Sequence, residues 1–87
     1  MSAYAINKIC YLVGNDLVFR GRILKDISQV LTEFKLDPEE RLAFEEGDVA
    51  TLFQHGGHII LLLILPRYNI GGLTQAEYDE RIAALNW

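Results

Sequence analysis

An uninterrupted apolar run, Ile59 to Leu65, constrains the fold of this 87-residue chain more than any other feature. It lies in the stretch LFQHGGHIILLLIL, and Pro66 and Arg67 follow it directly. A helix that crosses a bilayer needs about 20 apolar residues, so this run is too short to span a membrane. The run has no amphipathic period, and the sequence offers no convincing strand to pair with it. We therefore expect a wholly buried central helix.

Length, composition and charge limit the classes of protein to which the chain can belong. A chain of this length forms one domain, residues 1–87, with a limited core and little room for a deep enzyme cleft. Its hydrophobic content of 51% indicates that some apolar surface meets a partner. The net charge of −4 and the scattered basic residues argue against nucleic acid as that partner.

Two features of the sequence predict a cytoplasmic protein. The N-terminal residues MSAYAINK do not have the pattern of a secretory signal. The single cysteine, Cys10, cannot form an internal disulfide, and we expect it to be a small buried hydrophobic residue.

Helix start signals recur along the chain and predict an all-α fold of about six or seven short helices. Residues 3–13 have helical apolar spacing, and Gly14 is expected to end that helix as a left-handed cap. Leu24 is expected on the apolar face of the second helix, beside Phe19 and Ile23. Further starts are expected at Asn15 or Asp16, at Asp26 or Ser28, at Asp37 before Pro38, at Asp48, and at Thr74, which forms a capping box with Glu77.

The histidines, His55 and His58, raise the possibility of a metal site. Two histidines and one carboxylate can hold a catalytic iron, and Asp48 or Glu46 lies nearby in the sequence. The alternative is a helix junction in which an imidazole caps a helix or donates a hydrogen bond. Gly57, at the same junction, is expected to adopt a positive φ that side chains avoid.

Other polar residues give no catalytic pattern. The glutamates Glu39, Glu40, Glu45 and Glu46 are expected to form a solvated acidic helix face rather than an acid–base pair. The serines and threonines lie outside any nucleophile-elbow context. We expect no catalytic residue, no metal ligand and no cofactor in this chain.

Four segments, taken in order, resemble one known family. They are YAINKICYLV, FRGRILKDISQVLTEFKLDPEERLAF, GDVATLFQHGGHIILL and GGLTQAEYDERI. This order is similar to that of the small alpha subunit of protocatechuate 4,5-dioxygenase and of the equivalent domain in related extradiol ring-cleavage dioxygenases. The resemblance extends from Tyr4 to about Ile82. The connection PRYNIGG is shorter than the corresponding segment of that family.

The resemblance implies a helical accessory subunit without a catalytic site of its own. In that family the small chain packs on a larger chain, which carries the Fe(II), its two-histidine-one-carboxylate ligands and the catalytic base, and it helps to cover the active-site entrance. The residues expected to contact the catalytic chain are Gly57, His58, Arg67, Tyr68, Asn69 and Ile70. The alternative is a free-standing helical interaction module or homodimer without a dioxygenase partner, which the short connection favours.

Overall fold

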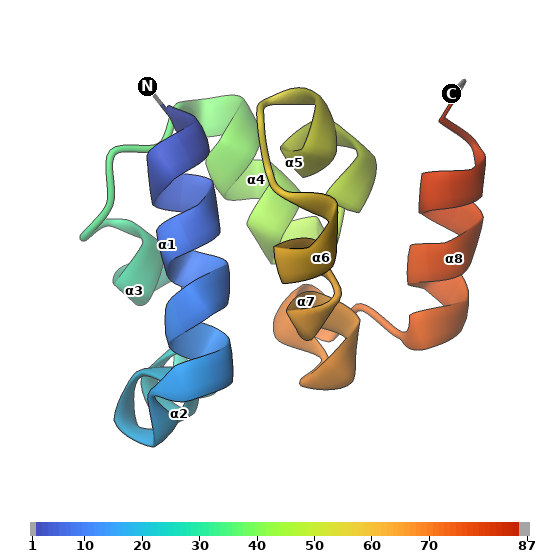
Figure 1. Ribbon diagram of the computed structural model, residues 1–87. Coiled ribbons are helices and arrows are strands. Elements are labelled where there is room, and N and C mark those ends of the chain that lie inside the picture. The colour runs from blue at the N-terminus through green and yellow to red at the C-terminus, as the bar shows by residue number, and fades with distance from the viewer. Residues whose placement is uncertain (1, 86–87) are drawn as a thin grey trace.

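The computed structural model describes residues 2–85, and within them the chain is all-α, as the sequence predicts (Figure 1). No strand occurs in this range. The helices in chain order are α1 (Ser2–Asn15), α2 (Leu17–Lys25), α3 (Ile27–Leu31), α4 (Pro38–Glu46), α5 (Val49–Gln54), α6 (Ile59–Leu62), α7 (Ile64–Arg67), the 3₁₀ turn η1 (Ile70–Gly72) and α8 (Gln75–Ala83).

Side-chain caps set most of the helix starts. At each cap, a side-chain oxygen accepts a hydrogen bond from the backbone N–H three residues later, which otherwise has no partner within the helix. These caps are Asp16 for α2, Asp26 for α3, Asp37 for α4, Asp48 for α5 and Thr74 for α8. The capping boxes at α4 and α8 are complete, because Glu40 and Glu77 accept from the N–H of their own caps. The predicted starts are therefore confirmed.

Two sequence expectations about the first helices are wrong. Gly14 does not end α1, which continues to Asn15, and it has no positive φ. A Cβ at Gly14 would lie 3.1 Å from Cδ1 of Ile64, so this glycine allows α7 to approach α1 closely. Leu24 is exposed although Phe19 and Ile23 are buried, because it lies about 100° further round α2 than Ile23.

One hydrophobic cluster joins the helices. α1 packs against α2 on one side and against α6 and α7 on the other, while α8 contacts α5 and α7 (Figure 1). Phe19 of α2 and Phe34 after α3 meet edge to face, with ring centroids 5.9 Å apart. The hydrophobic side chains with no exposed surface are Ile6, Ile9, Val13, Leu31, Val49, Leu52 and Leu62.

The apolar run is central in the fold, but it is neither one helix nor wholly buried. It forms the single turns α6 and α7, which meet at Leu63. Pro66 has no N–H to donate to the carbonyl of Leu62, so a continuous helix would lose a hydrogen bond there. Ile60 and Leu63 are 65% and 43% exposed. No helix in the described part of the chain is long and apolar enough to cross a bilayer.

Candidate functional site

Asn7 of α1 fixes the turn that precedes α6. Its Oδ1 accepts a hydrogen bond of 2.8 Å from the backbone N–H of His58, and its Nδ2 donates one of 3.3 Å to the carbonyl of Gly56. The two partners lie 51 and 49 residues away in the sequence. One amide side chain therefore determines where α6 begins relative to α1.

His58 caps α6 with its imidazole ring. Its Nδ1 accepts a hydrogen bond of 3.2 Å from the backbone N–H of Ile60. A ring nitrogen that accepts from an amide carries no proton, so the neutral ring in this position is protonated at Nε2. The sequence alternative of a capping imidazole at a helix junction is confirmed for His58.

Gly57 is needed for space rather than for backbone conformation. The expected positive φ at Gly57 is wrong: it occurs at Gly56, where φ is 104°. Gly57 itself is buried, and a Cβ there would lie 2.8 Å from the carbonyl oxygen of Leu52. The N–H of Gly57 donates to that same oxygen, so the close approach is part of the turn.

Tyr68, at the far end of the run, has two guanidinium groups close to its ring. The guanidinium carbon of Arg20 is 4.0 Å from the centroid of the Tyr68 ring, and that of Arg67 is 5.8 Å away. Arg20 also donates to the carbonyl of Val13 at 2.8 Å, which ties the ring to the end of α1. Tyr68 is half-buried as a result, whereas Arg67 is exposed.

The connection from Asn69 to Gly72 folds back onto α4. Asn69 has a φ of 55° and donates through Nδ2 to the carbonyl of Leu73 at 2.9 Å. Ile70 is only 2% exposed, and a Cβ on Gly71 would lie 2.2 Å from the carbonyl oxygen of Phe44. The connection therefore lies on this chain and does not project from it.

The structure separates the six predicted contact residues into two groups. Gly57 and His58 lie before α6, and residues 67–70 lie at and after the end of α7. Gly57 and Ile70 are buried within this chain. His58, Arg67 and Asn69 reach the surface, with Tyr68 partly exposed beside them.

Between these two groups lies exposed apolar surface that the sequence analysis missed. Ala3 approaches Gly56, Asn7 binds His58 and Gly14 contacts Ile64, so α1 and the apolar run are aligned side by side. Tyr11, one turn after Asn7 on the same side of α1, is 53% exposed, and Ile60 and Leu63 of the apolar run are exposed as well. We refer to Tyr11, Ile60 and Leu63 as the α1–α6 surface. A run without a period gives no sequence signal for which of its residues face solvent.

A second cluster joins α4 to the end of α5. Glu40 is 1% exposed, contrary to the solvated position expected for it. Its Oε2 lies 2.6 Å from Nδ1 of His55, whose Nε2 lies 3.0 Å from Oε1 of Glu39. The hydrogen bond with Glu40 raises the pKa of His55, with desolvation opposing it and the charges of Glu40, Glu39 and Asp37 adding to it. The carboxylates around His55 therefore stabilise the protonated form of its ring.

The possible metal site of His55 with His58 is not found in a metal-binding geometry among the described residues. Among the described residues, the one group whose donor atoms are close enough to hold a cation is Asp37, Glu39 and His55, within 4.8 Å of one another. His58, Asp48 and Glu46 are not part of it. Both ring nitrogens of His55 already face carboxylate oxygens, an arrangement that favours an ion pair over a metal ligand.

Cys10 is buried, as the sequence predicts. Burial raises the pKa of its thiol to about 12. A thiol in that environment stays protonated near neutral pH and is a poor nucleophile. The geometry gives Cys10 a place in the core and no access to a substrate.

Comparison with known proteins adds no relative. No family model matches the sequence, and no curated protein or solved structure matches it either.

Proposed function

We propose that this chain is a non-catalytic accessory subunit of an extradiol ring-cleavage dioxygenase, and that it packs in the cytoplasm on a larger chain carrying Fe(II). The observation that carries the proposal is the α1–α6 surface. Tyr11, Ile60 and Leu63 expose apolar side chains along α1 and the apolar run, and further exposed apolar side chains lie elsewhere on the described chain, at Tyr4, Leu17, Val18, Leu24 and Leu42. His58 and Arg67 supply polar groups at its two ends. An apolar centre with a polar rim is the usual anatomy of a protein interface.

The sequence resemblance supplies the identity of the proposed partner. In this proposal Ile60 and Leu63 bury their side chains on the catalytic chain near its active-site entrance. Such a cover would exclude water while oxygen reacts at the iron. The residues of this chain would shape the entrance, and every step of ring opening would take place on the partner.

Co-purification tests this proposal directly. The chain is expressed in its source cells with an affinity tag, and the purified material is examined by native mass spectrometry, iron assay and oxygen uptake with protocatechuate. We expect a larger iron-bearing chain and ring cleavage by the complex. Recovery of the tagged chain alone, or of a partner with neither iron nor ring-cleavage activity, would contradict the proposal.

A matched pair of variants tests the surface. Leu63→Asp places a charge in the α1–α6 surface, whereas Leu24→Asp places one at an exposed position on α2. We expect Leu63→Asp to abolish co-purification and Leu24→Asp to preserve it, with similar melting temperatures. Equal capture by both variants would show that the partner binds elsewhere.

The alternative is a free-standing helical module or homodimer. The observation that favours it is the connection after α7, which packs on α4 through Gly71 and leaves no projecting segment to serve as a lid. Sedimentation of the purified chain distinguishes the two. A stable dimer that Leu63→Asp converts to a monomer would favour the homodimer.

A further inference from the structure

The outer side of α2 is apolar and open to solvent. Leu17, Val18 and Leu24 are each more than half exposed, and Gly21 lies between them on the helix and is exposed as well. We refer to these four residues as the α2 face. Figure 1 shows α2 at the end of the molecule opposite the N-terminus of α1.

Gly21 is required neither by packing within the chain nor by backbone conformation. A Cβ at this position would meet no atom within 4 Å, and the φ of Gly21 is not positive. A glycine in the middle of a helix lowers stability by about 0.5 to 1 kcal/mol relative to alanine. An open gap in the side-chain surface of a helix suits the close approach of a second helix.

The leucines of the α2 face are placed almost symmetrically about Gly21. Leu17 lies about 6 Å before it along the helix axis and Leu24 about 4.5 Å after it, and both lie about 40 to 60° to the same side. A two-fold axis beside Gly21 would relate this helix to an antiparallel copy of itself. In that arrangement Leu17 of each chain faces Leu24 of the other.

The two ends of α2 carry opposite charges that an antiparallel copy would bring together. Asp16 caps the N-terminus and Lys25 lies in the last turn, and both side chains are exposed. Lys25 forms no ion pair with any described residue. In an antiparallel pair, Lys25 of one chain lies close to the level of Asp16 of the other, and the helix dipoles oppose each other. A parallel pair would place like charges together.

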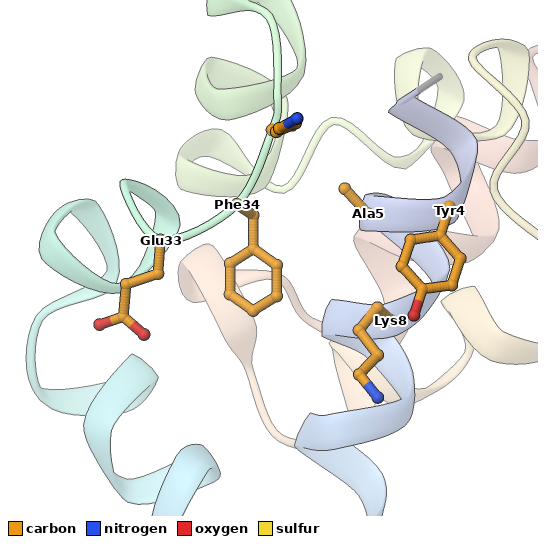
Figure 2. Close-up of a pocket in the computed structure, with 6 residues that line it drawn as sticks. Tyr4, Ala5, Lys8, Glu33 and Phe34 are labelled. Carbon is orange, nitrogen blue, oxygen red and sulfur yellow. The ribbon is translucent and has the colours of Figure 1, made fainter.

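The arginines of α2 already have partners within the chain. The guanidinium of Arg20 lies against the ring of Tyr68, and Arg22 pairs with Glu33. Glu33 also lines a pocket of about 550 Å³ between α1 and the segment that follows α3 (Figure 2). The residues that line this pocket, none of which belongs to the α2 face, are Tyr4, Ala5, Lys8, Glu33, Phe34 and Lys35.

We propose that α2 pairs with α2 of a second copy of this chain, in an antiparallel, two-fold symmetric contact centred on Gly21. The contact buries two pairs of leucines and joins Lys25 of each chain to Asp16 of the other. Stable interfaces bury about 1,200 to 2,000 Å², more than one nine-residue helix offers, so we expect a weak dimer with a dissociation constant of about 0.1 mM. The contact uses no residue of the α1–α6 surface.

Disulfide cross-linking of the full chain tests the position and direction of the contact. Gly21→Cys lies on the two-fold axis and should link to itself under diamide, at a chain concentration near the expected dissociation constant. We expect the linkage to form at least about tenfold faster than for the exposed Leu42→Cys on α4, because pairing raises the effective concentration of the two thiols. The native Cys10 is buried, and the pKa of its thiol is raised to about 12, so it does not compete.

A mixture of two further variants reports the direction of pairing. Leu17→Cys should link to Leu24→Cys, and each should link to itself much more slowly. Rapid linkage of each variant to itself would indicate a parallel pair. A rate for Gly21→Cys no higher than that of Leu42→Cys would overturn the contact altogether.

Sedimentation of matched variants over a range of concentrations tests the affinity. Leu24→Asp should raise the dissociation constant at least about tenfold, because it places a charge against the leucine of the other chain. Leu42→Asp, at a position of similar exposure, and Leu63→Asp in the α1–α6 surface should leave it unchanged. Equal melting temperatures at low concentration would confirm that the variants are folded. A wild type that stays monomeric at 1 mM, or a dimer that survives Leu24→Asp, would overturn the proposal.

Discussion

The pair α4–α5 and the pair α6–α7 are both short, yet they are specified in different ways. α4 and α5 each begin at an aspartate whose carboxylate accepts from an N–H three residues later, and α4 ends at Gly47 with a φ of 71°. α6 has a local cap at His58, but that cap is itself positioned by Asn7, 51 residues away, and α7 has no side-chain cap. Local hydrogen bonds define the first pair, whereas tertiary packing defines the second.

The largest expected effect distinguishes two adjacent leucines in the apolar run. Leu62 is fully buried and Leu63 is 43% exposed. Leu62→Ala should lower the free energy of unfolding by about 3 kcal/mol, because it leaves a cavity in the core. Leu63→Ala should lower it by less than about 1 kcal/mol. Urea denaturation measures both values, and similar losses would show that the run is buried as one continuous helix.

Gly57 tests whether space or backbone conformation sets the turn before α6. Gly57→Ala should destabilise by about 2 kcal/mol, because the new Cβ would press on the backbone oxygen of Leu52. Gly21→Ala is the control, since nothing lies within 4 Å of its Cβ. It should stabilise α2 by about 0.5 to 1 kcal/mol in the same assay. An unchanged stability for Gly57→Ala would contradict the tight packing of this turn.

Removing the cap of α5 should cause a smaller loss of stability. Asp48→Ala removes the acceptor for the N–H of Thr51 and should lower the free energy of unfolding by about 1 kcal/mol. Asp48→Asn keeps an acceptor in the same place and should cost only a few tenths of a kcal/mol. Thermal denaturation of the two variants gives the comparison. If asparagine were as harmful as alanine, the charge of Asp48 would matter more than its hydrogen bond.

The most subtle effect is the pH dependence due to His55. The pKa of His55 is raised on folding, so its contribution to stability is complete below its ordinary pKa of 6.5 and is lost as pH rises through the raised value. The stability difference between the wild type and His55→Gln should therefore shrink with increasing pH above 6.5. A difference that stays constant from pH 6 to about 9 would refute the role of His55.

The sequence predicted the locally determined parts of the structure and missed the parts that depend on distant residues. Asp37, Asp48 and Thr74 mark helix starts because each bonds to its own helix within three residues. The structure turns Glu40 back toward the N–H of Asp37 rather than out to solvent, and no local pattern places His55 against it. The sequence could not indicate that Ile60 faces solvent, because that depends on how α1 lies beside the run.

The candidate surfaces also depend on contacts between residues that are distant in the sequence. His58 and Arg67 were expected to contact a partner on the basis of the family resemblance, and both reach the surface. Ile70, expected at the surface of the same loop, is buried because the loop folds onto α4. The pocket beside Phe34 brings together residues 4–8 and 33–35, which no local pattern connects.

The two hydrogen bonds of Asn7 also have a consequence for synthesis of the chain. α1 leaves the ribosome before the turn that Asn7 binds, which is made about 50 residues later. Elongation proceeds at about 5 to 20 residues per second. For several seconds, therefore, the apolar side of α1 that packs on the turn and on α6 has no partner. A nascent chain that stops before Gly56 can never cover that flank. Premature termination between α1 and Gly56 should therefore yield fragments that chaperones and proteases recognise.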